Sequence, residues 1–326
     1  MRALFYMLCA VGVSCGGATE SGLDASAAGS SGQASPAAAK KSAKTLSSPR
    51  LLRSIGGAVD LQARGGYVYW NDYAAGFASK LVRVAERGGE LEIIFIRSLT
   101  PFTVVEDWLY YFEGGTGMGR MPSSGGSPEP LAATTSHCYV VAHTPANLFC
   151  AHGQGVIKLE RSSGEVSTLG KSQGYMAEGI AVDQSWVYWV AAGELLRVSQ
   201  QGGETQTLVP TLDVRGNLVG DAVWLYFSSG HSVLRVAKSG GEPEVLRRAA
   251  ARSLQLGDEH LFWLNNRSEP PFEIVATPLR GDAPDIIVAS SPTPFEGLAV
   301  GQRGVFWTTQ AGPSFSDGKL YVAEWQ

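Results

Sequence analysis

The sequence predicts an all-β protein, a seven-bladed β-propeller, from a repeat of about 40 residues and two markers that keep its period. The repeat begins near Arg50 and continues to the end of the chain. Its clearest copy, Gly179 to Trp189, has alternating apolar residues, a turn at Asp183-Gln184 and a second, aromatic-rich strand. Two more short strands follow, so each unit has the four strands of a propeller blade.

The first marker is a position at the end of the second strand of each unit that is aromatic in all units but one. It recurs at intervals of 36 to 44 residues, at Trp70, Tyr111, Cys150, Trp189, Phe227, Trp263 and Trp307. We expect the four tryptophans to fill the space between neighbouring sheets, where packing favours a large flat side chain. This position therefore predicts a core and not an aromatic ligand box.

The second marker is a glycine turn before the last strand of each of the first six units. It occurs at Gly88-Gly89, Gly125-Gly126, Gly164, Gly202-Gly203, Gly240-Gly241 and Gly281. Glycine suits such turns because it adopts positive φ without steric cost. Together the two markers give a count of seven blades, and six or eight blades are the alternatives.

The two ends of the domain are expected to pair. The seventh unit stops at its third strand, residues 319–323, three residues before the end of the chain. Residues 50–55 precede the first hairpin and can supply the missing outer strand. Such pairing closes the ring and removes the exposed edges that promote association, so we expect a monomer.

Several repeats resemble those of known propeller families. Gly179-Ile-Ala-Val-Asp183 with Val187-Tyr-Trp189, Tyr69-Trp-Asn-Asp72 and Phe306-Trp-Thr-Thr309 are similar to the YWTD repeats of lipoprotein-receptor propellers. They are equally similar to repeats of TolB-like and NHL-type propellers. The resemblance covers about residues 50 to 326 and implies an architecture only.

The first 15 residues are predicted to be a signal peptide. Met1-Arg2 gives a positive start, and residues 3–13 form an apolar run too short to span a bilayer. The junction Gly12-Val13-Ser14-Cys15 resembles the lipobox of bacterial lipoproteins, which implies that Cys15 carries the lipid anchor. An ordinary secretory signal is the alternative, and export follows from both interpretations.

Three segments are therefore expected: the signal at 1–15, a Gly/Ala/Ser-rich tether at 16–48 and the propeller at 49–326. The tether has almost no large apolar side chains, so its composition favours disorder. The residue after Cys15 is Gly16 and not the Asp that signals retention in the inner membrane in bacterial lipoproteins. The resemblance to these lipoproteins therefore favours the outer membrane or the cell surface. The net charge of -4 and the lack of a basic block argue against a nucleic-acid partner.

Chemistry-bearing motifs are scarce. None of the five histidines forms a metal-binding spacing such as HExxH, and no GxSxG nucleophile motif occurs. We therefore predict no catalytic residue, metal site or cofactor. Cys138 and Cys150 are the cysteines of the domain, and export favours a disulfide between them. The expected strand register places them on opposite faces, so a disulfide and two free thiols both stay open.

The predicted ligand site is the mouth of the central channel, where the inner strands begin. Counting back from the marker in each second strand to the start of the inner strand places Glu178, Arg252 and Glu296 there, with Tyr175 and Phe295 beside them. Arg252 and Glu296 belong to adjacent blades and could pair, which would neutralise one carboxylate and leave Glu178 as the lone acidic group. This arrangement suits binding of a polar or cationic group.

Two functions are compatible with these features. The first is a non-catalytic binding or scaffolding propeller anchored in the bacterial envelope, for a protein or small-molecule ligand. The alternative is a propeller hydrolase, lyase or lactonase with its site in the central channel. The absence of a nucleophile motif and of an acidic ring favours the first.

Overall fold

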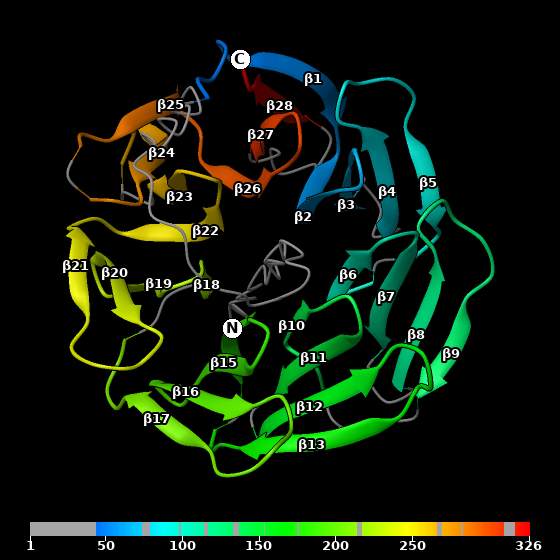
Figure 1. Ribbon diagram of the computed structural model, residues 1–326. Coiled ribbons are helices and arrows are strands. Elements are labelled where there is room, and N and C mark those ends of the chain that lie inside the picture. The colour runs from blue at the N-terminus through cyan, green and yellow to red at the C-terminus, as the bar shows by residue number, and fades with distance from the viewer. Residues whose placement is uncertain are drawn as a thin grey trace, which may run out of the picture.

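The computed structural model describes residues 44–73, 79–97, 99–113, 117–132, 137–152, 154–174, 176–213, 217–265, 269–281, 283–309 and 317–326. Within these ranges every regular element is a β-strand, and the strands form seven four-stranded antiparallel sheets. The sheets surround a central axis as the blades of a propeller (Figure 1). The predicted fold class and blade count are confirmed.

The first strand of each blade lies next to the axis. These inner strands are β2 (Gly57–Arg64), β6 (Phe102–Val105), β10 (Val140–His143), β14 (Ala177–Val182), β18 (Val219–Gly220), β22 (Ala251–Leu256) and β26 (Phe295–Val300). The second strands are β3 (Tyr67–Tyr73), β7 (Trp108–Glu113), β11 (Asn147–His152), β15 (Trp186–Ala191), β19 (Trp224–Ser229), β23 (His260–Asn265) and β27 (Gly304–Thr309).

The third and fourth strands complete each blade toward its outer edge. The third strands are β4 (Ser79–Ala85), β8 (Gly117–Pro122), β12 (Gly155–Glu160), β16 (Glu194–Ser199), β20 (Ser232–Ala237), β24 (Phe272–Pro278) and β28 (Gly318–Glu324). The fourth strands are β5 (Glu92–Phe95), β9 (Glu129–Ala132), β13 (Val166–Lys171), β17 (Gln206–Val209), β21 (Glu244–Arg247), β25 (Ile286–Ser291) and β1 (Arg50–Ile55).

The blades are numbered here in chain order. Blades 1 to 6 are the successive sheets from β2–β5 to β22–β25, and blade 7 combines β26, β27, β28 and β1. All inner strands run in the same direction, because every blade repeats the same antiparallel order. The face at which they begin is called the upper face, and the face at which they end is called the lower face.

Both termini of the domain lie in blade 7, as predicted. β1 pairs antiparallel with β28, from Arg50 opposite Val322 to Ile55 opposite Gly318, and the two strands lie side by side in Figure 1. An ion pair of 2.8 Å between Arg50 and Glu324 extends the contact at the surface. The outer edge of blade 7 is thus covered by the start of the domain, which confirms the predicted closure.

The four tryptophan markers are buried between blades. Trp70 and Trp189 are fully inaccessible to solvent, and Trp263 and Trp307 are 2% exposed. Trp189 of blade 4 lies in one hydrophobic cluster with Phe149 of blade 3, because the tryptophan side chain extends from its own sheet to the preceding one. The predicted core role of these residues is confirmed. The glycine turns also have the expected conformation, as at Gly202 with φ 82° and Gly203 with φ 122°.

Candidate functional site

Two glutamates lie in β-bulges where the inner strands of blades 4 and 7 begin. The ladder between β14 and β15 shifts register at Glu178, and the ladder between β26 and β27 shifts at Glu296. A β-bulge places an extra residue outside regular pairing and turns its side chain away from the direction set by strand alternation. Glu178 and Glu296 therefore share the same bulged position in their blades.

A glycine follows each of these glutamates because the neighbouring inner strand comes very close. A methyl group at Gly179 would lie 2.5 Å from the Leu218 backbone nitrogen, and one at Gly297 would lie 3.0 Å from Leu61 Cβ. The first distance leaves no room for a side chain. The Glu-Gly pair in both blades is thus a sequence signal of the bulge and of tight packing around the axis.

Glu296 is the more unusual of the two glutamates. Its side chain is partly buried, and none of the described residues forms a hydrogen bond or an ion pair with its carboxylate. Burial raises the pKa of Glu296 to about 7. This carboxyl therefore titrates closer to neutral pH than an exposed glutamate does, and a cation placed against it would lower its pKa again.

Glu178 does not lie beside Glu296. It is also partly buried, but it belongs to blade 4 and is separated from blade 7 by the ring of inner strands. The two glutamates therefore belong to blades that are not neighbours in the ring.

The other predicted mouth residues have different surroundings. Arg252 is exposed, and it does not pair with Glu296, so the predicted ion pair is wrong. The physical reason is that β22 shifts register after Arg252, whereas β26 shifts at Glu296 itself. Residues at the same distance from the marker therefore do not point their side chains in the same direction. Phe295 is partly buried against the core of blades 6 and 7. Tyr175 lies outside the described residues.

Blade 1 also has an acidic residue at this level, but hydrogen bonds enclose it. Asp60 is 3% exposed and has a positive φ of 56°, which is uncommon for a residue other than glycine. Its carboxylate accepts hydrogen bonds from Asn71 Nδ2 at 3.1 Å and Thr100 Oγ1 at 2.8 Å. Asp60 therefore joins blade 1 to the segment that leads into blade 2.

Amide side chains hold neighbouring inner strands together. Asn217 of blade 5 donates from Nδ2 to the Leu254 carbonyl at 2.6 Å and accepts from the Leu254 N–H at 2.8 Å. Gln62 of blade 1 donates to the Phe102 carbonyl at 2.7 Å. These bonds join blade 5 to blade 6 and blade 1 to blade 2. They give the mouth a rigid frame, which favours a preformed site.

Basic side chains join neighbouring blades farther from the axis, and these contacts were not predicted from the sequence. Arg83 donates to the Ser123 carbonyl at 2.9 Å, and Arg197 donates to the Lys238 carbonyl at 2.6 Å. The guanidinium of Arg83 also stacks on Tyr67, with 4.0 Å between the guanidinium carbon and the ring centroid. Each such arginine joins its own blade to the next one.

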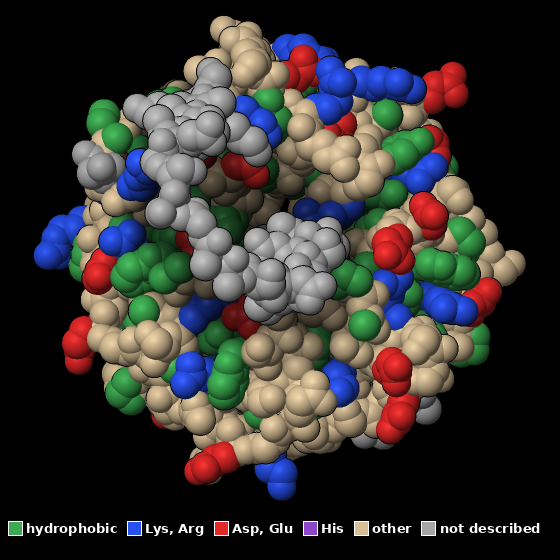
Figure 2. All heavy atoms as spheres, in the orientation of Figure 1, with side chains coloured by type: hydrophobic (Ala, Val, Ile, Leu, Met, Phe, Trp, Pro, Cys, Tyr) green, Lys and Arg blue, Asp and Glu red, His purple; other side chains and the backbone are tan. Residues whose placement is uncertain are grey.

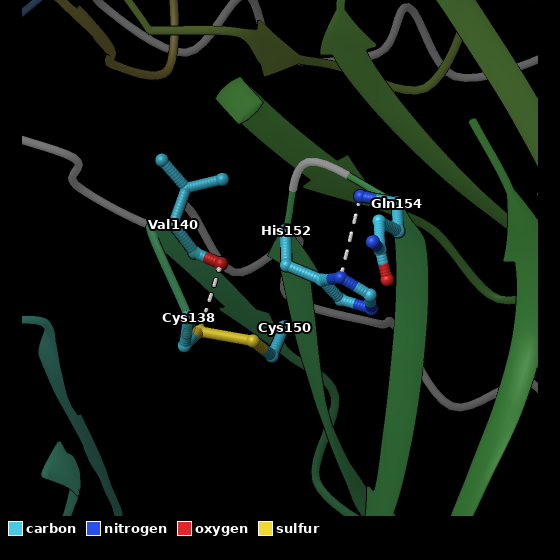
Figure 3. Close-up of a disulfide and its surroundings, with 5 residues drawn as sticks. All are labelled: Cys138, Val140, Cys150, His152 and Gln154. Atoms are coloured by element: carbon cyan, nitrogen blue, oxygen red, sulfur yellow. Dashed lines mark hydrogen bonds between the residues drawn. A yellow bond between two sulfur atoms is a disulfide. The ribbon is translucent and has the colours of Figure 1, made fainter. Parts of the chain in front are cut away.

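The structure joins Cys138 and Cys150 in a disulfide, with 5.5 Å between their Cα atoms (Figure 3). Cys150 lies opposite Val141 in the ladder, as expected from the register. Cys138, however, precedes β10, which begins at Val140, so strand alternation does not fix its direction. This is why the register argument against the bond does not hold.

His143 lies at the lower end of β10 and is 6% exposed. Burial, with the positive charges of Arg64 and Arg161 adding to it, lowers the pKa of His143 to about 3. The imidazole is therefore neutral at neutral pH. A buried neutral ring suits a structural role at this end of the channel.

The surface provides no single charged patch on the face seen in Figure 2, where acidic and basic side chains are interspersed. Among the described residues, no group of three or more His, Cys, Asp or Glu side chains is placed to hold a metal ion. In the same part of the chain, no helix has the length and apolar character that a bilayer crossing requires.

Comparisons with known proteins give likeness of structure but not of sequence. No family model matches the chain, and no curated protein matches it. A catalytically inactive virginiamycin B lyase from Staphylococcus aureus, solved with quinupristin, is similar with a TM-score of 0.62 and 12% identity, over 84% of this chain and 99% of that one.

Two further solved structures are similar over a smaller share of their own length. The extracellular domain of the one-component system BT4673 from B. thetaiotaomicron has a TM-score of 0.61 and 10% identity, over 83% of this chain and 40% of that one. PorZ, a surface component of the type-IX secretion system of Porphyromonas gingivalis, has a TM-score of 0.59 and 15% identity, over 85% and 39%. The likeness is one of fold. The neighbours named here are an enzyme, a bacterial surface component and an extracellular domain.

Proposed function

We propose that the protein is an exported binding propeller that holds a polar or cationic group of its ligand at the upper channel mouth. The observation that supports this most is the partly buried Glu296 carboxylate, which has no partner among the described residues. A buried carboxylate without a partner is destabilising in its charged form, and a bound cation relieves that cost. Glu178, in the equivalent bulge of blade 4, offers a second acidic contact across the mouth.

Titration of the full-length protein with spermidine, a flexible polycation, tests this proposal. We expect saturable binding at about pH 8 that weakens as the pH falls below about 7, because protonation removes the charge of Glu296. The double variant Glu178→Gln/Glu296→Gln is expected to lose about tenfold in affinity, the size expected when charged contacts to a ligand are removed. Calorimetry measures both effects.

The matched control is Glu204→Gln, which removes one exposed carboxylate next to the Gly202-Gly203 turn on the lower face. This variant is expected to bind spermidine as the unmodified protein does. Full binding by the double variant at the mouth, or an equal loss in Glu204→Gln, would show that the mouth is not the site. Melting temperatures of all variants check that the fold is retained.

A second candidate is an enzyme with its site at the same mouth, as in the hydrolase, lyase or lactonase interpretation. The pKa of Glu296 near 7 favours it, because a group that titrates near the working pH is suited to proton transfer. The structural likeness to virginiamycin B lyase suggests quinupristin as a first test substrate. Loss of quinupristin in the presence of the protein, but not of its Glu296→Gln variant, would favour this candidate.

The location of the protein is proposed from the N-terminal sequence, which lies outside the described residues. The lipobox-like junction ending at Cys15 supports a lipid anchor in the outer membrane or at the cell surface. Cys15→Ser is expected to move the protein from the membrane fraction to the soluble fraction, because only the cysteine thiol can receive the lipid. Fractionation followed by immunoblotting measures this change, and unchanged fractionation would contradict lipid anchoring.

A further inference from the structure

Seven structurally equivalent residues follow the third strands, one in each blade. Each donates its backbone N–H to a carbonyl in the turn before the second strand of its own blade, as Arg161 does to Ala146 at 3.0 Å and Lys238 does to Val223 at 2.9 Å. These residues are Glu86, Ser123, Arg161, Gln200, Lys238, Leu279 and Trp325. Each of them lies near the lower face, next to the preceding blade, in what is called here an inter-blade slot.

Two of these slots are filled by a basic side chain over a tyrosine ring. Arg161 of blade 3 donates to Tyr110 Oη at 2.8 Å and pairs with Glu106 at 3.0 Å, and its guanidinium lies 5.2 Å from the Tyr110 ring centroid. Lys238 of blade 5 lies 5.4 Å from the Tyr188 ring centroid and pairs with Asp183 at 2.9 Å. The repeat therefore builds a slot that accepts a cation.

The slot between blades 1 and 2 has the same tyrosine but no such basic side chain. Its tyrosine is Tyr69, and the residue equivalent to Arg161 and Lys238 is Ser123. A cavity of about 330 Å³ lies there, lined by Tyr69, Ser123, Trp108 and Asp107 among others. The short serine side chain leaves open the space that a longer side chain occupies in the other two slots.

The charges around this cavity permit a further cation. Arg83, which also lines it, donates to Tyr69 Oη at 3.5 Å and is neutralised by Glu92, 2.6 Å away. The exposed carboxylate of Asp107 stands at the rim. The slot between blades 4 and 5 shows that two cations can lie in one slot. Arg197 and Lys238 are both present there, and the Arg197 guanidinium donates to the Lys238 carbonyl.

We propose that the slot between blades 1 and 2 binds the guanidinium or ammonium head group of another molecule in the cavity lined by Tyr69, Ser123 and Trp108. The head group takes the place that Arg161 and Lys238 occupy in their own slots. Its carrier is a small amine or guanidine, or a basic side chain of a partner protein, since both present the same chemistry. This site is on the lower face and is separate from the channel mouth.

The test uses the full-length Glu178→Gln/Glu296→Gln variant as background, so that the mouth does not contribute. Saturation-transfer NMR and calorimetry are applied with n-butylguanidinium, with an acetylated and amidated Gly-Arg-Gly peptide, and with the neutral analogue n-butylurea. We expect saturable binding of both cations and none of the urea. Ser123→Arg is expected to abolish binding, because the new side chain fills the slot as Arg161 does.

Two further variants keep the outcome decisive. Gln200→Arg makes the same change in the slot between blades 3 and 4 and is expected to leave binding unchanged. Asp107→Asn changes an exposed side chain, which keeps the fold, and is expected to weaken binding about two- to fivefold. Equal affinity for both cations favours a small ligand as the carrier, and tighter binding of the peptide favours a partner chain. No saturable binding, or equal binding in Ser123→Arg, would overturn the proposal.

Discussion

Deletion of residues 44–55 is expected to make the protein aggregate at micromolar concentration. The deletion removes β1 and exposes the whole edge of β28, whose backbone groups then have no partner in the ring. It also removes the contacts of the preceding segment, including the hydrogen bonds Ser47 N to Glu324 O and Gln326 N to Thr45 O, both 2.8 Å. An open edge in an otherwise closed all-β protein is a template for association.

Size-exclusion chromatography with light scattering measures this effect. The matched control is deletion of residues 16–43, whose composition predicts no contribution to a packed core. This control is expected to remain a monomer with an unchanged melting temperature. A monomeric and equally stable product of the 44–55 deletion would show that pairing of the two ends is dispensable.

Trp189→Ala is expected to lower the free energy of unfolding by about 3–5 kcal/mol, the range for loss of a large buried aromatic side chain. Trp189 is fully buried and fills the space between blades 3 and 4 together with Phe149 and Leu196. Alanine leaves a cavity that rigid sheets on both sides cannot close. Chemical denaturation monitored by circular dichroism measures the change.

Trp189→Phe is the matched control for this prediction. Blade 5 has Phe227 at the equivalent position and packs it fully buried. In addition, the Trp189 indole nitrogen has no hydrogen-bond partner among the described residues, so phenylalanine forfeits no bond there. We expect this variant to lose clearly less stability than Trp189→Ala. Equal losses would mean that the indole has a role beyond filling space.

The ring could be predicted from sequence because its markers are local and recur. A tryptophan between sheets is favoured by packing and recurs in four units, and a glycine in a tight turn is favoured by backbone geometry and recurs in six. The arginines that join neighbouring blades also have a recurring sequence signal, which was not recognised. Arg83 and Arg235 each have a glutamate nine residues later that pairs with it, Glu92 and Glu244.

The candidate site could be predicted only in part, because its geometry depends on irregular pairing. Counting from the markers placed Glu178 and Glu296 at the mouth. A bulge, however, changes the direction of a side chain and alters the number of residues between markers too little to be recognised in the sequence. The Arg252 ion pair failed for this reason. The disulfide could not be predicted for a related reason: Cys138 lies two residues before Val140, where β10 begins, so strand alternation does not determine the direction of its side chain.

The place of β1 also decides how the molecule responds to mechanical load. A pull on the chain that precedes Lys44 acts first on the short contacts around Trp325 and then on the β1–β28 ladder. Hydrogen bonds, the Arg50–Glu324 ion pair and the buried Ile55 resist it together. The strand that closes the ring would therefore unfold first under tension, and an anchored molecule would open at blade 7 before any other blade is strained.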